Sequence, residues 1–499
     1  MNRLPFYCLL LFLVLLFFLA RLIELQLIFG HRYRLLADGN RLRQIVLPAP
    51  RGLIFDRHGQ ALVINRPLYR LCPNENSCRP LTRDEAFRFL VEAGSTADQI
   101  QLFPARFYPF GETLAHLLGY LDGDNQPRAG LEKQVNELLQ GQEGGELVEV
   151  DALDRRLRRL GQKKPLPGRD LTLTLDARLS QVAFEALAAR RGALVVTQAQ
   201  TGQILALVSS PSFDPNQLDP NLLTAETKPF FNRAVSGAYP PGSVFKIITA
   251  TAGLEENKIT GQSLFTDDGF LRVGDFIYRN WYFTQYGRTE GAINVSRALA
   301  RSTDTFFYKV GEWVGAEALL AWAKKFNLGE KSGLDLLSES AGHLPEMTQR
   351  FYLGNLYHLA IGQGDLLVTP LQANLIASVI ANHGQLCLPR MLKTENPSPC
   401  QKLGLKEETL KLIKEGMIGA CSTGGTAWPL FDFKPQVACK TGTAEYGDPT
   451  GKTHAWLVAF APADEPQIII SVLVEGGGEG SSVAAPIAKK VLEAWFIKK

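Results

Sequence analysis

The sequence predicts an α+β protein with an N-terminal membrane helix, a β-rich pedestal, and a larger domain in which an antiparallel sheet carries flanking helices and a helical subdomain. Three observations support this fold class. A long apolar segment opens the chain, short strand-like runs separated by turns follow it, and strand patterns at both ends of residues 169–499 enclose a helical middle. The length of 499 residues also exceeds one typical domain.

The N-terminal segment indicates a membrane anchor. The run from Leu4 to Ala20 is apolar and continues amphipathically to Ile28, which is long enough for one membrane helix. A cleaved signal peptide is the alternative, but residues 18–21 lack the small-x-small cleavage pattern. We therefore expect residues 1–30 to form a short tail and a transmembrane anchor. Arginines on both sides of the segment leave its orientation open.

Residues 31–168 mix short strand patterns with turns, and they predict the β-rich pedestal. A turn over residues 51–59 precedes the strand-like run Ala61–Ile64. A basic stretch over residues 155–169 ends in a Pro-Gly pair, where we place the domain boundary. An arginine-rich, solvated strand is the alternative interpretation of that stretch.

Residues 169–499 predict one antiparallel sheet built from the two ends of the domain. The expected strands are residues 171–175, 192–196, 204–208, 437–439, 455–460 and 468–474, with helices near 179–189 and 485–496. Helical patterns dominate between residue 244 and about residue 420. The simplest topology packs the sheet against this mostly helical insertion.

Composition and charge exclude several classes of protein. The 53 Lys and Arg residues nearly balance the 50 Asp and Glu residues, and the net charge of +3 gives no reason to expect a nucleic-acid partner. The 45 Gly and 28 Pro residues follow no period, which excludes collagen, and a hydrophobic share of 45% excludes wholesale disorder. Local sites must therefore carry the function.

The seven cysteines bear on the compartment and on metal binding. Cys72 and Cys78 flank a turn, and Cys387 and Cys400 bracket a Pro-rich loop. Such spacing suits disulfides formed outside the cytosol, but reduced thiols stay equally open for each pair. The sequence has no pair of CxxC motifs and no HExxH motif, so it indicates no metal site.

A Ser-x-x-Lys motif gives the first candidate for chemistry. Pro240, Pro241 and Gly242 would deliver Ser243 to the start of a helix, where free N–H groups stabilise developing negative charge. Lys246 lies on the same helical face, and burial would lower its pKa and let it accept the serine proton. Taken alone, the pair is better explained by an N-cap serine beside an exposed lysine.

Two further motifs follow in the chain. Ser302-Thr303-Asp304 precedes a helical pattern, and Lys440-Thr441-Gly442-Thr443 continues a strand whose glycine lets a ligand backbone come close. A helix cap and a strand end explain each motif taken singly. Together, and in this order, the three motifs match the Ser-x-x-Lys, Ser-x-Asn and Lys-Thr-Gly set of penicillin-recognising serine enzymes.

On these motifs the chain resembles the class B penicillin-binding proteins, most closely the elongation-type peptidoglycan D,D-transpeptidases of the penicillin-binding protein 2 family. The likeness covers nearly the whole chain, including the apolar N-terminal segment. Its further matches are Arg51-Gly52-x-Ile54-x-Asp56-Arg57-x-Gly59, Gly130-Leu131-Glu132, residues 211–216, Asn232-Arg233, Gly362-Gln363-Gly364 and residues 369–372. The resemblance implies that residues 31–168 are a pedestal or dimerisation-like domain and residues 169–499 a transpeptidase domain.

The resemblance also implies the chemistry. Ser243 would attack the penultimate D-Ala carbonyl of a peptidoglycan stem peptide, or a β-lactam antibiotic, with Lys246 as base and Ser302 as proton shuttle. The backbone N–H groups of Ser243 and Thr443 would form the oxyanion hole. The implied substrate-binding residues are Asp304, Lys440, Thr441, Gly442 and Thr443. Neither a cofactor nor a metal is implied, and the segment Asp267–Arg301, where some relatives hold a metal, contains no His or Cys.

Location and partners follow from the same resemblance. It implies a single pass through the cytoplasmic (inner) membrane, a short cytoplasmic tail, and a catalytic domain in the periplasm or outside the cell. No glycosyltransferase domain precedes the pedestal, so the expected partners are a separate glycan polymerase and cell-elongation membrane proteins. Most relatives carry Asn where this chain has Asp304, although elongation-type members often carry Asp there. We expect the Asp304 carboxylate to bond mainly to backbone and substrate amide groups, away from Lys246; the alternative is that Lys440 takes up most of its field.

Two other functions stay in view. A membrane-anchored D,D-carboxypeptidase or β-lactamase-like hydrolase would use the same serine and lysine, but it would need a water-activating group that nothing in the sequence marks. A non-catalytic scaffold or β-lactam sensor fits less well, because all three motifs are present.

Overall fold

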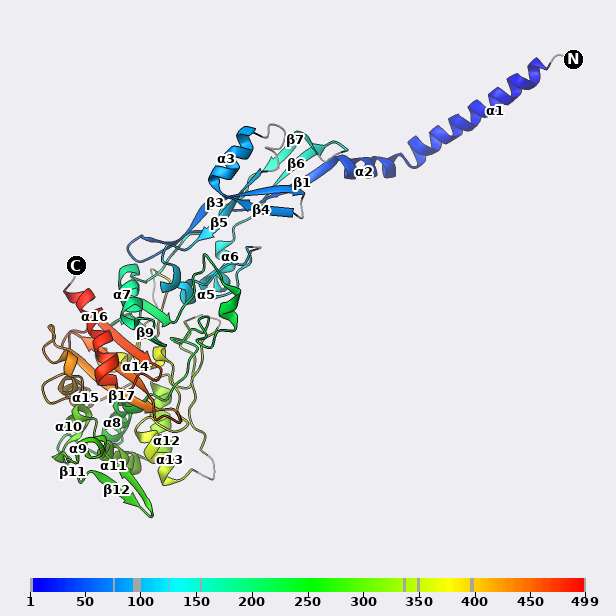
Figure 1. The fold of residues 1–499 in the computed structure, drawn as a ribbon. Coiled ribbons are helices and arrows are strands. Elements are labelled where there is room, and N and C mark those ends of the chain that lie inside the picture. The colour runs from blue at the N-terminus through cyan, green and yellow to red at the C-terminus, as the bar shows by residue number, and fades with distance from the viewer. Residues whose placement is uncertain are drawn as a thin grey trace. The chain divides into compact units, whose positions relative to one another are not determined.

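The structure is a computed structural model that describes residues 3–74, 77–92, 100–123, 125–152, 155–334, 338–347, 351–394 and 399–497. It is a mixed α+β fold with an N-terminal apolar helix (Figure 1), which confirms the predicted fold class. Contacts group the chain into two compact units. Unit 1 contains residues 1–52, 65–105 and 137–169, and unit 2 contains residues 53–64, 106–136 and 170–499.

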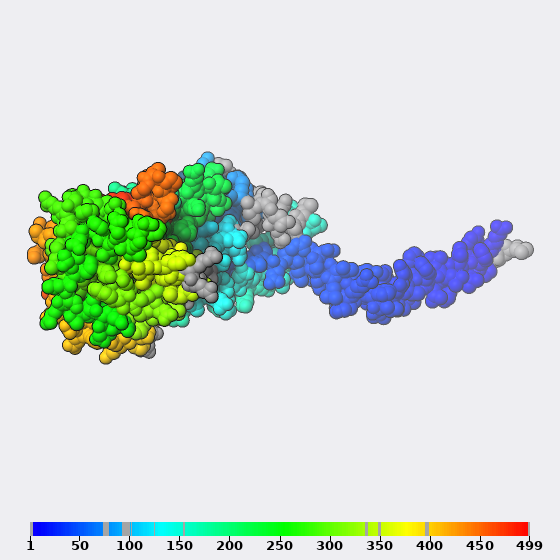
Figure 2. Space-filling view, turned by 90° about the horizontal axis from the view of Figure 1, so that it is seen from below, coloured from blue at the N-terminus to red at the C-terminus, as the bar shows by residue number. Residues whose placement is uncertain are grey.

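Among the described residues, one helix is long and apolar enough to cross a membrane. Helix α1 (Leu4–Ile23) continues through a π-helical turn (Glu24–Ile28), and α2 (Gly30–Arg41) follows. No side chain of α1 is buried in the protein, and its apolar side chains are exposed along the whole helix. The helix is the blue segment of the space-filling view (Figure 2). Because water disfavours so much exposed apolar surface, a bilayer is the natural environment of this helix.

Unit 1 contains a three-stranded antiparallel sheet in the order β1-β6-β7, formed by β1 (Leu42–Leu47), β6 (Gly144–Val150) and β7 (Arg156–Lys163). Every side chain of β7 is exposed, and Arg158 Nε lies 2.6 Å from a carboxylate oxygen of Glu149 on β6. This basic segment is therefore a solvated strand. The other elements that lie wholly or mostly in unit 1 are β3 (Ala61–Asn74), β4 (Ser77–Leu81), β5 (Ile100–Phe107), α3 (Arg83–Glu92) and α6 (Asn136–Leu139).

A turn with a buried carboxylate opens unit 2. Strand β2 (Ile54–Phe55) pairs with the beginning of β3 and, in parallel, with β8 (Leu171–Thr172). Between β2 and β3, the carboxylate of Asp56 accepts hydrogen bonds from the backbone N–H groups of His58 and Gln60, both at 2.8 Å. It also accepts one at 3.3 Å from Ala177, the first residue of α7 (Ala177–Leu187). One acidic residue thus closes the turn and satisfies a free N–H at a helix start.

The main sheet of unit 2 has five antiparallel strands in the order β10-β9-β19-β18-β17. They are β9 (Gly192–Gln198), β10 (Ile204–Ser210), β17 (Ala438–Glu445), β18 (Thr453–Ala461) and β19 (Ile468–Val474). Strand β19 pairs with β9, with Ile470 opposite Val196, so the sheet joins the two ends of the domain as the sequence predicts. Strand β17 lies at the end of this order, and no strand of the described residues pairs with its second edge.

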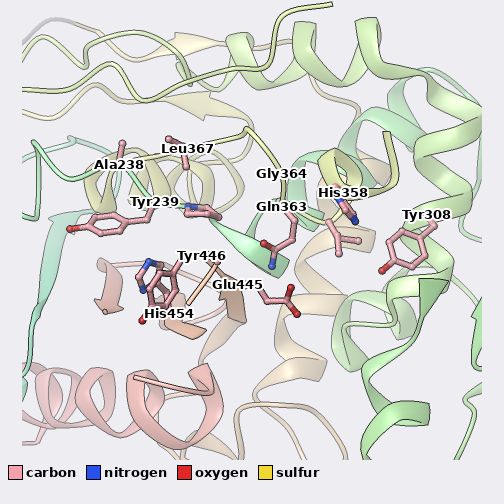
Figure 3. Close-up of a pocket in the computed structure, with 13 residues that line it drawn as sticks. Ala238, Tyr239, Tyr308, His358, Gln363, Gly364, Leu367, Glu445, Tyr446 and His454 are labelled. Atoms are coloured by element: carbon pink, nitrogen blue, oxygen red, sulfur yellow. The ribbon is translucent and has the colours of Figure 1, made fainter. Parts of the chain in front are cut away.

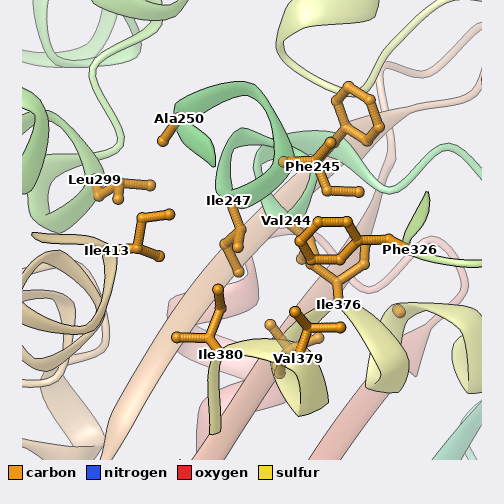
Figure 4. Close-up of a cluster of buried hydrophobic side chains, with 14 of the residues drawn as sticks. Val244, Phe245, Ile247, Ala250, Leu299, Phe326, Ile376, Val379, Ile380 and Ile413 are labelled. Carbon is orange, nitrogen blue, oxygen red and sulfur yellow. The ribbon is translucent and has the colours of Figure 1, made fainter. Parts of the chain in front are cut away.

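Helices cover both faces of this sheet, which explains why β19 is apolar at every position except Ser471 and why all of its residues are buried. On one face lie α7 and α16 (Ala485–Phe496), and on the other α14 (Pro370–Ala381), which is buried along its whole length. Thr369 and Gln372 form a capping box that starts α14 at Pro370. Figure 4 shows how Val244, Phe245 and Ile247 pack against Phe326 and the isoleucines of α14. Each such side chain stabilises the fold by roughly 1.5–3 kcal/mol.

The remaining described elements of unit 2 are mostly short, except for α15 (Glu407–Ala420). Its helices are α4 (Ala115–Leu118), α5 (Gly130–Gln134), α8 (Lys246–Glu255), α9 (Trp281–Tyr286), α10 (Val295–Arg301), α11 (Asp304–Val314), α12 (Ala316–Lys325), α13 (Leu353–Ala360) and α15 (Glu407–Ala420). Three two-stranded ladders complete it, β11 (Phe265–Asp267) with β14 (Gly291–Ile293), β12 (Phe270–Val273) with β13 (Phe276–Arg279), and β15 (Gln385–Leu386) with β16 (Gln401–Lys402).

Disulfides link several of the cysteines. Cys387 is bonded to Cys400, and Cys421 at the end of α15 is bonded to Cys439 on β17. Cys72 is also disulfide-bonded, whereas the side chain of its candidate partner Cys78 lies outside the described part of the chain. The sequence left the Cys387 pair open and did not suggest the Cys421 pair.

Candidate active site

The turn before α8 brings Ser243 against strand β17. Gly242 has a φ of +54°, and a Cβ added there would lie 2.7 Å from the carbonyl oxygen of Thr443. Only glycine allows this backbone at so short a distance. Residues 242–244 form a 3-10 turn that leads directly into α8, so half-buried Ser243 stands at a helix start, as predicted.

Two buried lysines meet at one serine hydroxyl. Lys246 Nζ donates to the backbone oxygen of Ser302 at 2.8 Å and to its Oγ at 3.3 Å. Lys440 Nζ donates to the same Oγ at 2.8 Å and to the carbonyl oxygen of Thr441 at 2.9 Å. Ser302 ends α10 in the left-handed region, with a φ of +56°, and this unusual backbone directs it between the lysines. Residues of all three motifs thus form one buried cluster.

Asp304 contradicts one expectation. Its Oδ1 lies 2.5 Å from Lys246 Nζ, while Oδ2 accepts the backbone N–H of Trp281 at 3.0 Å. The expectation that this carboxylate lies away from Lys246 is therefore wrong. The physical reason is that two fully buried amines need a counter-charge, and Asp304 is the carboxylate that reaches one of them.

A second buried carboxylate holds the Asp304 segment in place. Asp267 accepts hydrogen bonds from Asn280 Nδ2 at 2.9 Å and from Thr305 Oγ1 at 2.7 Å, and from the backbone N–H groups of Gly269 and Glu290. Asn280 in turn accepts the backbone N–H of Asp304 at 3.2 Å. The start of α11 is therefore fixed from outside the catalytic cluster.

The electrostatics of the cluster are asymmetric. Burial lowers the pKa of Lys246, and the nearby Asp304 carboxylate opposes this effect. Burial, reinforced by the charge of Lys246, lowers the pKa of Lys440 well below its ordinary value, and Asp304 opposes this only as the weakest of the three causes. The Asp304 carboxylate therefore stabilises the charged form of Lys246 more than that of Lys440.

The Lys-Thr-Gly-Thr segment lies along the open edge of the sheet. A Cβ at Gly442 would lie 3.0 Å from the carbonyl oxygen of Pro241, so the strand packs closely on the Ser243 turn. Thr441 Oγ1 contacts Thr426 Oγ1 at 2.7 Å, and the side chain of Thr443 is exposed. The carbonyl oxygen of Thr443 accepts a hydrogen bond from Gln363 Nε2 at 3.4 Å.

Sequence reasoning missed several residues of this site. Trp281 gives no sequence signal, because its role depends on a backbone N–H. Gln363 lies in the quoted Gly-Gln-Gly motif, although no role was assigned to it. Tyr308 and Glu445 line a cavity beside the cluster, and they follow the second and third motifs at the spacing of one helical turn and one strand repeat.

A serine presented at a helix start, two buried lysines that share a second serine, and an open strand edge beside them define a penicillin-recognising serine acyltransferase. The penicillin binding protein transpeptidase domain model matches residues 192–493, and the penicillin-binding protein dimerisation domain model matches residues 96–173. The peptidoglycan D,D-transpeptidase MrdA of Acinetobacter baumannii is 31% identical over 96% of this chain and 85% of its own length. The chain belongs to the penicillin-binding proteins, as a peptidoglycan D,D-transpeptidase related to MrdA.

Solved structures agree with this family. PBP2 of Helicobacter pylori, in complex with MreC, has a TM-score of 0.78 and 27% identity, and the match covers 92% of this chain and all of that one. A chain solved in work on the structural coordination of polymerization and crosslinking by a peptidoglycan synthase complex has a TM-score of 0.78 and 31% identity, covering 100% of this chain and 99% of that one. The family and the enzyme class predicted from the sequence are confirmed.

Proposed function

We propose that Ser243 is the nucleophile of a stem-peptide cross-linking reaction. Its Oγ attacks the carbonyl carbon of the penultimate D-Ala, the terminal D-Ala leaves as the free amino acid, and an acyl-enzyme ester forms. The amine of a neighbouring stem peptide then attacks the ester and releases Ser243. The observation that carries this proposal is the hydrogen-bonded cluster of Lys246, Ser302 and Lys440 beside the Ser243 turn.

The geometry favours a proton path from Ser243 through Ser302 to Lys440. Lys246 has the Asp304 carboxylate and the Ser302 carbonyl as acceptors, which suits an ammonium group. Lys440 has no carboxylate partner in the described part of the chain, so it is the amine better able to stay neutral and accept a proton. The same proton then returns to the nitrogen of the leaving D-Ala. The sequence had assigned the base to Lys246, and the ion pair with Asp304 is our reason for revising this.

Strand β17 supplies the other groups. The backbone N–H groups of Ser243 and Thr443 form the oxyanion hole, which stabilises a tetrahedral intermediate by about 3–4 kcal/mol per donor. Lys440 and the side chains of Thr441 and Thr443 receive the terminal carboxylate of the substrate, with Gly442 allowing close approach. Lys440 becomes positive as it takes the proton, so the carboxylate and the transferred proton stabilise each other.

Location and partners are part of the same proposal. Helix α1 anchors the chain in the cytoplasmic membrane, with residues 31–168 as pedestal and residues 169–499 as the transpeptidase domain on the extracytoplasmic side. The disulfides Cys387–Cys400 and Cys421–Cys439 support an oxidising compartment. PBP2 of H. pylori was solved with MreC, and the second neighbour is part of a synthase complex. We infer that this chain likewise works with membrane partners of cell elongation and with a separate glycan polymerase.

Covalent capture of a fluorescent penicillin tests the proposal. The full chain should be labelled in a 1:1 ratio, and Ser243→Ala should remain folded but unlabelled, because the ester needs the serine oxygen. Slow loss of label would separate a transpeptidase from a β-lactamase-like hydrolase, which would release it rapidly. Undiminished labelling of Ser243→Ala would refute the assignment of the nucleophile. Cross-linking of lipid-linked substrate in the presence of a candidate polymerase then tests the full reaction.

A further inference from the structure

The loop of residues 421–427, which follows α15, carries a hydroxyl group that the three motifs do not explain. Thr426 Oγ1 lies 2.7 Å from Oγ1 of Thr441, a residue of the Lys-Thr-Gly-Thr segment. Within the described part of the chain, each of these two hydroxyls has the other as its hydrogen-bond partner and makes no second such bond. The contact therefore joins the loop to the strand that is proposed to receive the substrate.

The 421–427 loop is held in place on both sides of Thr426. Cys421, at its start, is bonded by a disulfide to Cys439 on β17. The carbonyl oxygen of Gly424 accepts a hydrogen bond at 2.9 Å from Nη1 of Arg301, the last residue of α10. The loop is thus tied to β17 by a covalent bond and to the helix that precedes Ser302 by a charged donor, so the position of Thr426 is defined.

The disulfide lies on the same face of β17 as Thr441. Side chains alternate along a strand, so Cys439, Thr441 and Thr443 point to one face and Lys440 points to the other. Thr443 is exposed, whereas Thr441 keeps only 7% of its surface exposed. Because little water can reach the Thr441 hydroxyl, the Thr426 hydroxyl is the group that determines where the Thr441 proton points.

The other end of β17 belongs to a different part of the site. A cavity of about 650 Å³ lies beside Glu445, the last residue of the strand, and Figure 3 shows Glu445 there with Gln363 and Tyr446. None of the described residues that line this cavity belongs to the 421–427 loop. The loop therefore contacts β17 at the end where the terminal carboxylate of the substrate is received.

The direction of the hydrogen bond follows from counting protons. A threonine hydroxyl has one proton to donate and two lone pairs that accept. If Thr441 gives its proton to the substrate carboxylate, it can only accept from Thr426, and Thr426 must be the donor in their contact. The result is a chain from Thr426 to Thr441 to the carboxylate, in which each hydrogen bond polarises and strengthens the next.

We propose that Thr426 is a positioning residue for the substrate carboxylate: its hydroxyl donates to Oγ1 of Thr441 and so directs the Thr441 proton to the carboxylate. The inference rests on the proposed function, which places the carboxylate at Thr441. A hydrogen bond to a charged acceptor is stronger than one to a neutral acceptor. The contribution of Thr426 must therefore depend on the negative charge of the compound that binds.

Acylation by two matched compounds tests this inference. Benzylpenicillin carries its carboxylate on the carbon attached to the lactam nitrogen, as the terminal D-Ala does on the carbon attached to the amide nitrogen. Its methyl ester keeps the lactam ring and lacks the charge. The second-order acylation rates of both compounds are measured for the full chain in detergent, by competition with fluorescent penicillin.

Three variants separate the hydroxyl from the shape of the loop. Thr426→Val removes the hydroxyl and keeps the branched shape, and Thr426→Ser keeps the hydroxyl. Ser422→Ala is the matched control, because this hydroxyl lies in the same loop but donates to the carbonyl oxygen of Ile418 at 2.8 Å. A double-mutant cycle with Thr441→Val then measures whether Thr426 acts through Thr441.

We expect Thr426→Val to slow acylation by benzylpenicillin about three- to tenfold and acylation by the methyl ester less than about twofold. Thr426→Ser and Ser422→Ala should keep the rates of the unmodified chain. In a chain that already carries Thr441→Val, Thr426→Val should have no further effect. Equal slowing of both compounds, no slowing of either, or additive effects in the cycle would overturn the inference.

Failure of the proposed function would give a different result. If the unmodified chain reacted equally fast with benzylpenicillin and its methyl ester, the carboxylate site on β17 would be refuted, and the inference with it. If the unmodified chain favours benzylpenicillin and Thr426→Val keeps that preference, only the role of Thr426 is refuted.

Discussion

Replacing Asp304 by Asn tests how the two buried lysines share their charge. The amide keeps an oxygen that can accept the backbone N–H of Trp281, so the start of α11 should be preserved. What disappears is the negative charge 2.5 Å from Lys246 Nζ. Because Asp304 favours the ammonium form of both Lys246 and Lys440, its loss must increase the fraction of neutral lysine at any given pH.

The expected size of this effect follows from the contact. An opposite charge at this distance changes the free energy of ionisation by roughly 1.4–4 kcal/mol, which is at least about a tenfold change in the fraction of neutral amine. Acylation needs a neutral lysine as proton acceptor, so the rate falls on the acidic side of its pH profile. In Asp304→Asn this acidic limb should move to lower pH.

The assay is the pH dependence of the second-order rate of penicillin acylation, with each profile scaled to its own plateau. Glu479→Gln is the matched control, because it removes one negative charge from an exposed residue that pairs with Gln285 rather than with a lysine. Its profile should coincide with that of the unmodified chain. An acidic limb that stays in place in Asp304→Asn, or moves to higher pH, would refute the coupling between Asp304 and the proton acceptor.

Three other predictions can be checked with the same protein. Lys246→Met should slow penicillin acylation by at least about a hundredfold, measured by stopped-flow, because it removes a proton-carrying group from the cluster; a near-normal rate would exclude Lys246 from the reaction. Replacing residues 1–30 by a cleavable secretion signal should give a soluble protein that still captures penicillin but no longer supports cell-wall growth, and growth support would show that tethering is dispensable. Burial lowers the pKa of His116 to about 4 from an ordinary value of 6.5. Stability should therefore be intact above pH 6.5 and fall by roughly 3 kcal/mol as the pH drops toward 4. His116→Gln should flatten the pH dependence of Tm over this range, and an unchanged slope would argue against a buried neutral imidazole.

The sequence predicted those parts of the site that depend on local spacing. Ser243 and Lys246 are close because a turn and a helix start place them so, and the strand that carries Lys440 follows from its apolar pattern. The orientation of Asp304 could not be predicted, because it depends on the left-handed backbone of Ser302 and on where two distant lysines are buried.

Long-range pairings could not be predicted from the sequence either, because they depend on how distant segments pack. Cys421 lies at the end of helix α15, and Cys439 lies near the start of strand β17. No pattern in a single sequence shows that these two positions meet. Glu445 looks like an ordinary solvated strand residue until the cavity beside it is known. The domain boundary at residue 168 was drawn from composition and stays a prediction. Unit 2 takes in residues 53–64 and 106–136 through contacts that composition does not report.

The pairing of β9 with β19 has a consequence for how the enzyme comes into being. Gln198 lies opposite Ile468, so the central ladder of the sheet joins segments made early and late in synthesis. Such high contact order makes folding slow, because a long loop must close before the contacts that reward it can form. The edge strand that carries Lys440 joins the sheet through β18 and β19, and cannot be placed earlier. A chain cut short before β19 would therefore lack penicillin capture altogether rather than retain a weak form of it.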